Sequence, residues 1–298
     1  MRILHLSDVH VTVPIAALPW RQMFNKRLIG ALNLTLRRAR HFEGAADKLH
    51  ALAAFAEREH VDLVICTGDY TALGTEPELI AARRAIAPLT SRPYGFVTVP
   101  GNHDLYLPDC IRDRRFERNF EELLHSDLPE TRVEGPWPIV RLVGDDIAVV
   151  AVNSARANPQ PWRSSGSIPD AQLRALQSLC EDPRIAQRFV FVITHYAPFR
   201  SDGTPDRRSH GLVNAPALLD ACRSLRRGAL LHGHIHHRFC VNVPGFSLPI
   251  FSAGSTTCDG REGFWLFELD QASARAVPGS WTGGRYEVHG GAALSLGA

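Results

Sequence analysis

The sequence has no apolar stretch near the length of about 20 residues that a membrane-spanning helix needs. It also has no Cys-x-x-Cys spacing, because its six cysteines are scattered along the chain. We therefore expect reduced thiols, as in a cytosolic protein, and no disulfide framework. Nothing at the start resembles a cleavable signal peptide, since a predicted strand begins at residue 2. Together these absences predict a cytoplasmic protein.

Charge of one sign is not in excess, because 33 Lys and Arg residues stand against 31 Asp and Glu residues, for a net charge of +2. This balance creates no overall field that favours nucleic acid, so a nucleic-acid partner is not expected. With 298 residues and 45% hydrophobic content, the chain can build one substantial core. We predict a single domain over residues 1–298.

Short, continuous apolar runs predict strands that are buried on both faces. Five such runs cover residues 3–6, 63–66, 96–99, 189–193 and 229–231. Apolar residues at helical spacing separate several of them, as at Leu49, Leu52 and Phe55. Strand and helix therefore alternate, which predicts an α/β fold whose first half is a largely parallel sheet.

Each of these five runs is followed by side chains with oxygen or imidazole donors. The blocks are Asp8-Val9-His10, Gly68-Asp69, Gly101-Asn102-His103-Asp104, Thr194-His195 and Gly233-His234-Ile235-His236. A single Asp-x-His is common and means little, but five blocks in this context are hard to obtain by accident. Because ligands of such sheets gather at the carboxyl edge of the strands, we expect the blocks to meet there.

The donors are carboxylates, one amide and imidazoles, with no thiolate among them. They are Asp8, His10, Asp69, Asn102, His195, His234 and His236. Seven ligands are too many for one tetrahedral ion but suit two cations that share a carboxylate. Mixed nitrogen and oxygen donors without sulfur favour manganese, iron or cobalt over structural zinc. The sequence therefore predicts two divalent metal ions, with Mn²⁺ and iron preferred and Zn²⁺ or Co²⁺ as alternatives.

This constellation resembles the calcineurin-like metallophosphoesterase superfamily, whose pattern runs Asp-x-His, Gly-Asp, Gly-Asn-His-Asp/Glu, His, Gly-His-x-His. All five blocks occur in order, between residue 3 and about residue 256, with no substitution at a ligand position. The resemblance implies a first metal held by Asp8, His10 and His236. It implies a second metal at Asn102, His195 and His234, with Asp69 as the bridge.

The same resemblance assigns roles to the two residues that follow Asn102. His103 looks like the family's catalytic histidine, which protonates the leaving oxygen or steadies the charged phosphate, and Asp104 looks like its orienting carboxylate. We count Asn102 and His103 as substrate-binding residues too, together with His210 on the loop after the His195 strand. The alternative for His210 is an ordinary exposed loop histidine.

The resemblance also implies the fold, a four-layer αββα sandwich of two mixed β-sheets flanked by helices. Five later apolar runs are expected to supply the second sheet. They lie at residues 139–143, 147–153, 239–243, 250–253 and 264–269.

Two details indicate which branch of the superfamily the chain resembles more. Protein Ser/Thr phosphatases of this superfamily usually carry Asp-x-His-Gly and Gly-Asn-His-Glu, whereas here Val11 follows His10 and the third block ends in Asp104. The chain therefore resembles the bacterial phosphodiesterases and pyrophosphatases of the superfamily more than its protein phosphatases. We predict hydrolysis of a phosphodiester or pyrophosphate, with a lipid-linked substrate as one form, by a hydroxide that bridges the metals. The alternatives are a cyclic-nucleotide phosphodiesterase, a DNA exonuclease-like enzyme and, from another class, a non-catalytic interaction scaffold.

The residues at about 14–42 differ in composition from the rest of the chain, and we interpret them as a basic amphipathic insertion. From Trp20 to Phe42 it has six Lys or Arg residues and no acid, mixed with aromatic residues and leucines. We interpret it as a cap over the site or as a contact with an anionic membrane surface, which would place the protein at the inner face of the membrane. The alternative is a solvated surface helix. The residues at about 290–298 are expected to form a loose tail.

Overall fold

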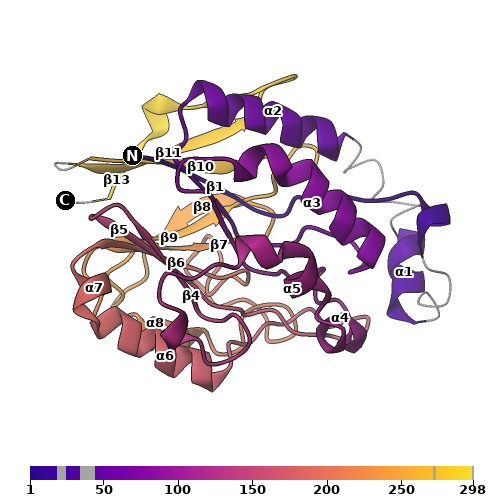
Figure 1. Cartoon of the computed structure of the whole chain (residues 1–298), viewed down its shortest axis with the longest axis horizontal. Coiled ribbons are helices and arrows are strands. Elements are labelled where there is room, and N and C mark those ends of the chain that lie inside the picture. The colour runs from indigo at the N-terminus through magenta and orange to yellow at the C-terminus, as the bar shows by residue number, and fades with distance from the viewer. Residues whose placement is uncertain (19–24, 34–43, 271–272, 297–298) are drawn as a thin grey trace.

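A computed structural model of the chain describes residues 1–18, 25–33, 44–270 and 273–296. Its strands form two sheets that lie face to face between outer helices, as Figure 1 shows. Helices α2 (Ala45–Arg58) and α3 (Glu76–Thr90) cover one sheet, and α6 (Asp170–Glu181), α7 (Pro183–Ala186) and α8 (Ala215–Ala221) cover the other. The expected four-layer αββα sandwich is therefore confirmed.

The first sheet has the order β12-β11-β10-β1-β2-β3, with β13 paired to β11. Its strands are β1 (Arg2–Leu6), β2 (Leu63–Cys66), β3 (Phe96–Thr98), β10 (Phe264–Leu269), β11 (Ala274–Trp281), β12 (Tyr286–Val288) and β13 (Leu294–Ser295). Strands β1, β2 and β3 are parallel, while β10 runs antiparallel to β1.

The second sheet has the order β4-β5-β6-β7-β9-β8. Its strands are β4 (Ile139–Val143), β5 (Ile147–Ala151), β6 (Phe189–Ile193), β7 (Gly228–His232), β8 (Arg238–Val241) and β9 (Ile250–Ala253). The four inner strands are parallel, and the edge strands β4 and β8 are antiparallel.

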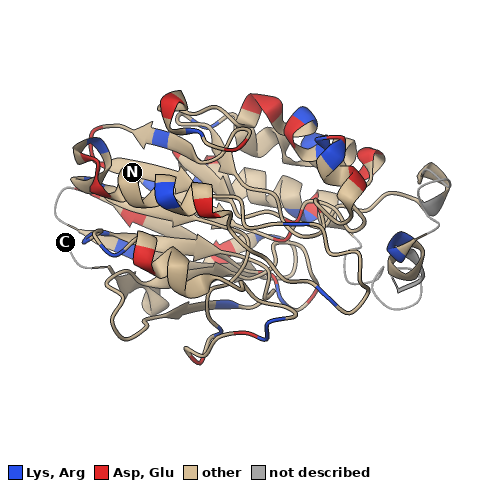
Figure 2. Cartoon of the chain, turned by 90° about the horizontal axis from the view of Figure 1, so that it is seen from below, with Lys and Arg blue, Asp and Glu red and all other residues tan. Residues whose placement is uncertain are grey.

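The helices are α1 (Lys26–Asn33), α2 (Ala45–Arg58), α3 (Glu76–Thr90), α4 (Pro108–Arg112), α5 (Arg115–Phe120), α6 (Asp170–Glu181), α7 (Pro183–Ala186) and α8 (Ala215–Ala221). Within the described ranges no helix is both long and apolar enough to cross a bilayer. Residues of both charge signs are mixed over the outer helices (Figure 2).

The core between the sheets is built from the apolar strand residues that the sequence pattern pointed to. Phe267 of β10 packs against Phe191 of β6 and Phe251 of β9, with ring centroids 5.1 Å apart in both pairs. These rings are fully buried. Burying apolar area between the sheets is the main force that holds them together, and it fixes the edge at which the loops meet.

Two expectations about the chain's second half are wrong. The run at 264–269 does not belong to the second sheet, because β10 pairs with β1 at the heart of the first sheet. An apolar run shows that a strand is buried but not which strand is its partner. The expected loose tail is also wrong for the residues described, since Gly290–Ala292 forms a 3₁₀ turn and β13 pairs with β11.

The basic insertion contributes a described helix, α1, which lies at one end of the sandwich (Figure 1). Arg27 of α1 reaches Asp109 of α4, so the helix is anchored to the body of the protein. The rest of the insertion's characteristic residues lie outside the described ranges. They are Trp20, Arg21, Met23, Phe24, Arg37, Arg38 and Arg40.

Candidate metal centre

Strands of both sheets carry the five predicted blocks. Asp8, Asp69 and Asn102 follow β1, β2 and β3 of the first sheet, while His195 and the His234-Ile235-His236 block follow β6 and β7 of the second. Leu6 and Cys66 are neighbours in register, so the loops that carry Asp8 and Asp69 leave the sheet side by side. The structure thus brings the five blocks together, as the pattern predicted.

The backbone at this edge is strained. Among the residues that the structure describes, seven non-glycine residues have a positive φ, and five of them are predicted metal ligands. Those five are Asp8, His10, Asp69, His234 and His236. Such conformations cost of order 1–3 kcal/mol each and persist where the surrounding structure enforces them, often at functional sites.

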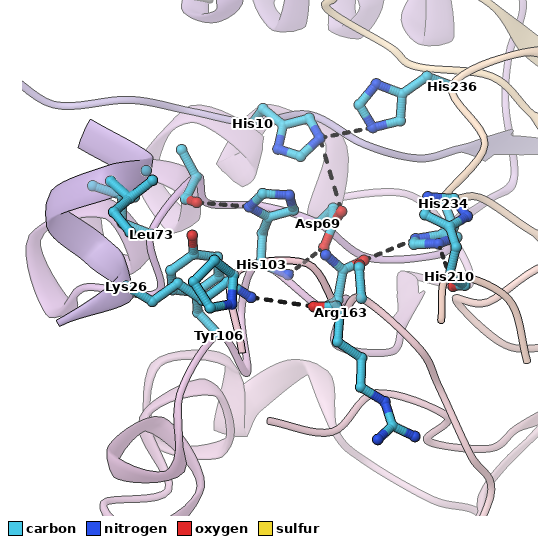
Figure 3. A pocket seen from close by; sticks show the side chains of 16 residues that line it. His10, Lys26, Asp69, Leu73, His103, Tyr106, Arg163, His210, His234 and His236 are labelled. Carbon is cyan, nitrogen blue, oxygen red and sulfur yellow. Dashed lines mark hydrogen bonds and ion pairs between the residues drawn. The ribbon is translucent and has the colours of Figure 1, made fainter. Parts of the chain in front are cut away.

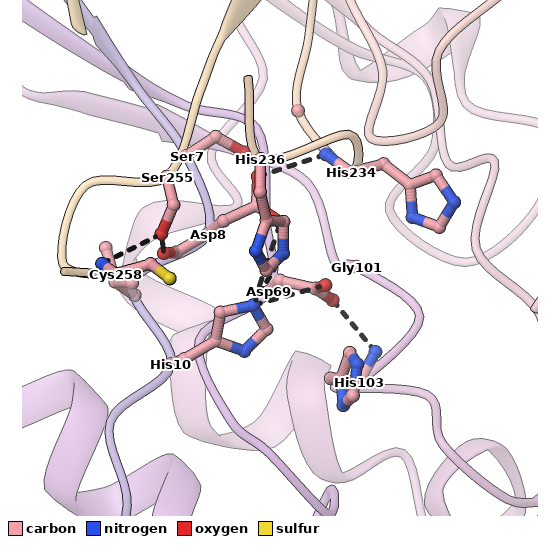
Figure 4. Close-up of polar contacts among 12 residues, drawn as sticks. Ser7, Asp8, His10, Asp69, Gly101, His103, His234, His236, Ser255 and Cys258 are labelled. Atoms are coloured by element: carbon pink, nitrogen blue, oxygen red, sulfur yellow. Dashed lines mark hydrogen bonds and ion pairs between the residues drawn. The ribbon is translucent and has the colours of Figure 1, made fainter. Parts of the chain in front are cut away.

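The first donor group consists of Asp8, His10, Asp69 and His236. One ligand atom from each of them lies within 4.8 Å of the others. His236 Nε2 is 3.0 Å from Asp8 Oδ1 and 3.1 Å from His10 Nε2. His10 Nε2 is 3.8 Å from both Asp8 Oδ1 and Asp69 Oδ2. Figure 4 shows these side chains turned toward a common point.

The second donor group shares Asp69 with the first. His195 Nε2 lies 3.5 Å from Asp69 Oδ2 and 3.0 Å from Asn102 Oδ1. His234 Nδ1 lies 2.8 Å from the same Asn102 oxygen. Asp69 Oδ2 therefore stands between His10 of one group and His195 of the other, which is the position that a bridging carboxylate takes.

Backbone carbonyls determine which ring nitrogen of His10, His195 and His234 faces the other donors. The carbonyl oxygens of Thr71 and Thr67 lie 2.9 and 2.7 Å from Nδ1 of His10 and His195, and leave Nε2 for a metal. In His234 the roles are reversed, because Nε2 lies 3.0 Å from the carbonyl oxygen of His210 and Nδ1 faces Asn102. Such contacts fix the tautomer and the ring orientation of metal-binding histidines.

The charges fit cations at this place. Burial, with the neighbouring Asp8 and Asp104, raises the pKa of Asp69 well above its usual value. Burial also lowers the pKa of His10 and of His195, which keeps these rings neutral as metal binding requires. Asp8 is also fully buried, with His236 Nε2 3.0 Å from its Oδ1. Two adjacent buried carboxylates surrounded by imidazoles suit divalent cations.

His103 lies beside both donor groups and lines the adjoining cavity. The Ala72 carbonyl oxygen lies 2.6 Å from its Nδ1 and holds the ring. The ring centroids of His103 and His10 are 5.1 Å apart, and those of His103 and Tyr106 are 5.6 Å apart. The His103 ring therefore stands at the cavity beside the donors.

Asp104 is buried and binds the backbone of the two neighbouring loops. Its Oδ2 accepts hydrogen bonds from the amides of Asp69 and Gly101, at 3.0 and 2.8 Å. Its Oδ1 accepts from the amides of Tyr70 and Thr71, at 2.9 and 3.0 Å. Both oxygens are thus occupied by the two loops that carry Asp69 and Asn102. Asp104 therefore positions the backbone of both loops, while the expectation that it also orients the His103 ring stays a prediction.

Three consecutive hydroxyl residues support the first donor group and were missed in the sequence. Ser255, Thr256 and Thr257 donate to the carbonyl oxygens of Asp8, Ser7 and Val9, each at 2.7 Å. Lys48 of α2 holds the same loop by donating to the Thr257 carbonyl at 2.9 Å. The signal in the sequence is a run of three hydroxyl residues that starts one glycine after the predicted strand at 250–253.

A cavity of about 500 Å³ opens over the donors (Figure 3). His10, Asp69, Asn102, His103, His234 and His236 line its floor. Lys26, Ile29 and Gly30 of α1 form part of the wall, so the described part of the insertion does lie over the site. His210 also lines the cavity, with its ring bound to Asp206 at 2.6 Å.

Comparisons with known proteins agree with this geometry. The model of the calcineurin-like phosphoesterase family matches residues 1–238. A dimetal phosphatase from Danio rerio has a TM-score of 0.62 at 15% identity, over 96% of this chain and 98% of that chain. A purple acid phosphatase from yellow lupin seeds also has a TM-score of 0.62, at 11% identity, over 99% of this chain and 53% of that chain.

At these identities the structural likeness shows the fold alone. Comparison with curated proteins gave no significant match. The family model, however, spans most of the chain, and the seven predicted donors converge in the structure. The protein belongs to the calcineurin-like phosphoesterase family and is a metal-dependent phosphoester hydrolase.

Proposed function

We propose that the protein hydrolyses a phosphodiester or a pyrophosphate rather than a simple phosphomonoester. The observation that carries this proposal is the cavity, which extends from the donors past His103 and Tyr106 to α1 and to the loop at Pro161. A monoester has one organic group on phosphorus, whereas a diester or pyrophosphate needs space on both sides of it. The volume of about 500 Å³ is within the range of small-molecule sites.

The seven donors would hold two divalent cations with Asp69 shared between them. Such cations would supply positive charge for the phosphoryl oxygens. They would also lower the pKa of a water molecule, so that hydroxide is available as the nucleophile near neutral pH. Donors of nitrogen and oxygen without thiolate support Mn²⁺ and iron as the pair. The metal pair is tested by measuring the metal content of protein purified from cells grown with balanced Mn, Fe, Zn and Co.

The protein's own residues have separate tasks in this scheme. Asn102 offers a neutral amide near the developing negative charge, and His103 is held by Ala72 with its Nε2 directed away from that carbonyl. We assign His103 as the group that donates a proton to the leaving oxygen. His210, whose carbonyl holds His234, borders the space for the organic group. We expect the enzyme to work in the cytoplasm, in keeping with its free cysteines.

The test compares three chromogenic or coupled substrates with the Mn²⁺-supplied protein. These are bis(p-nitrophenyl) phosphate, p-nitrophenyl phosphate and a nucleoside diphosphate ester. We expect kcat/KM for the diester or the pyrophosphate to exceed that of the monoester by about tenfold or more, the factor given by about 1.4 kcal/mol of extra binding. A monoester that is hydrolysed faster than both others would contradict the proposal.

A further inference from the structure

Helix α1 turns its charged residues inward. Arg27 is fully buried, and its guanidinium donates to both carboxylate oxygens of Asp109, at 2.9 and 3.0 Å. Its Nε donates to the carbonyl oxygen of Leu73 at 2.9 Å. Lys26, the residue before it, donates to the carbonyl oxygen of Asn158 at 2.7 Å and lies over the Tyr106 ring. The two cations therefore fasten α1 to the body of the protein, and Figure 3 shows Lys26 at the cavity beside Tyr106.

The next two residues of α1 are apolar and face outward. Leu28 is 47% exposed and Ile29 is 50% exposed. A helix at a water-facing surface normally has the opposite arrangement, with apolar residues inside and charges outside. Ile29 also lines the cavity, so this apolar surface lies at the mouth of the site.

A second exposed apolar side chain belongs to the loop across the mouth. Trp162 is 79% exposed, more than any other large hydrophobic residue in the described part of the chain. Its neighbours Pro161 and Arg163 line the same cavity as Ile29. Lys26 also donates to the carbonyl oxygen of Arg163, at 3.3 Å, so α1 and this loop are in contact. Large apolar residues therefore stand on two sides of the opening.

Basic residues lie close to these exposed apolar side chains. The amide of Ser164 donates to the carbonyl oxygen of Ser209 at 2.8 Å, which places the Trp162 loop beside the loop that carries Arg207 and Arg208. Arg163, Arg207 and Arg208 are all exposed. Among the described residues, no carboxylate forms an ion pair with any of these three arginines. The nearby Asp206 is paired with His210 instead.

We propose that these residues form a surface, the mouth rim, that docks on an anionic lipid bilayer and presents the cavity to a phosphoester whose lipid part stays in the membrane. The mouth rim consists of Leu28, Ile29, Trp162, Arg163, Arg207 and Arg208. Exposed tryptophan and aliphatic side chains next to unpaired cations are typical of interfacial membrane contacts. A second copy of the chain is a poorer occupant, because it would oppose the same arginines to one another.

This inference rests on the proposed phosphoester hydrolysis, and both can be tested on the full chain. The first measurement is co-sedimentation with phosphatidylcholine vesicles that contain or lack phosphatidylglycerol, at low salt. We expect binding to the anionic vesicles, weaker at high salt because ions screen the arginines. Hydrolysis of soluble bis(p-nitrophenyl) phosphate with Mn²⁺ is measured in parallel.

Two double variants separate the apolar and the basic parts of the rim. Leu28→Gln/Trp162→Ser should bind the anionic vesicles about tenfold or more weakly, since two large apolar contacts are lost. Arg207→Gln/Arg208→Gln should lose about fivefold in affinity per arginine. Both variants should hydrolyse the soluble diester at the wild-type rate. Tyr94→Ser is the matched control, because Tyr94 is exposed but precedes β3, at the opposite end of that strand from the site.

Each outcome decides one of the two claims. If the wild type ignores anionic vesicles while hydrolysing the soluble diester, the rim proposal is wrong and the proposed function stands. If Leu28→Gln/Trp162→Ser binds vesicles as well as Tyr94→Ser does, the rim proposal is also wrong. If that variant instead converts a dimer to a monomer in light scattering, the rim is a contact between copies. Failure to hydrolyse any phosphoester with Mn²⁺ would overturn the proposed function whatever the vesicles show.

Discussion

The backbone amide of His103 donates a hydrogen bond to Oδ1 of Asp69 at 2.8 Å. This contact leaves the other oxygen, Oδ2, between His10 at 3.8 Å and His195 at 3.5 Å. The residue that we assign to proton transfer thus also aims the carboxylate that joins the two donor groups. The proposed proton donor and the proposed metal bridge are therefore joined by a direct hydrogen bond from the loop after β3.

The shared carboxylate gives the first prediction. Asp69→Asn should lower the rate of phosphoester hydrolysis by more than about 10²-fold, because removing even a supporting partner of a metal ligand costs about 10–100-fold. The neutral amide no longer offsets two cations, so bound metal should fall as well. Metal analysis and Mn²⁺-supplemented rates check this. A variant with the wild-type rate and full metal content would refute the shared role of Asp69.

Metal removal gives the second prediction. Asp8 and Asp69 are buried side by side, and burial with Asp8 nearby raises the pKa of Asp69, so the ionised form of Asp69 is disfavoured until a cation offsets its charge. Saturation with Mn²⁺ at about 100 times Kd should add about 2.7 kcal/mol to the free energy of unfolding. Thermal denaturation with EDTA and with Mn²⁺ measures the difference. Equal melting temperatures in the two conditions would argue against a metal centre here.

His103→Ala provides the third prediction. The variant should keep both metals and lose about 10²–10⁴-fold in rate, the usual contribution of a general acid. The loss should be larger for alkyl than for nitrophenyl esters, because poor leaving groups need the proton more. His125→Ala is the control, since His125 is an exposed histidine outside the site. An equal loss for both esters would point to charge stabilisation by His103 instead.

The position of Asp104 leads to the fourth prediction. Asp104→Asn places an NH₂ group against backbone amides that all donate, which should cost about 1–3 kcal/mol of stability. The two ligand loops should then loosen, and metal affinity should fall by about 10–100-fold. Denaturation curves and metal titration test both effects. Unchanged stability and metal affinity, with a lost preference between ester leaving groups, would favour a direct role on the His103 ring.

Gly101 is the subject of the fifth prediction. A Cβ at this position would lie 2.0 Å from Asp69 Oδ1 and 2.4 Å from the Asp69 amide nitrogen. Gly101→Ala should therefore displace the shared carboxylate and abolish most activity, with a loss of about 1–3 kcal/mol in stability from overpacking. Gly291→Ala meets no atom within 4 Å and serves as the matched control. Comparable rates for the two variants would contradict the geometry of this loop.

Much of the site follows from the sequence because its signals are local. An apolar run of four or five residues predicts a buried strand, and a polar block directly after it must lie at that strand's carboxyl end. For this reason the sequence alone places Asp8, Asp69 and His195 each at the carboxyl end of a strand. The same reasoning places Leu49, Leu52 and Phe55 on one face of a helix, which is α2.

Only the tertiary structure decided which distant segments meet. It paired β10 with β1 rather than with the second sheet, and it placed the Ser255 hydroxyl against the Asp8 carbonyl. It also directed backbone amides of two loops to both carboxylate oxygens of Asp104. It also turned Arg27 inward and Leu28 outward on a helix that the sequence showed only as basic and amphipathic. Residue type fixes what a side chain can bind, but packing of the two sheets and their loops fixes what lies within its reach.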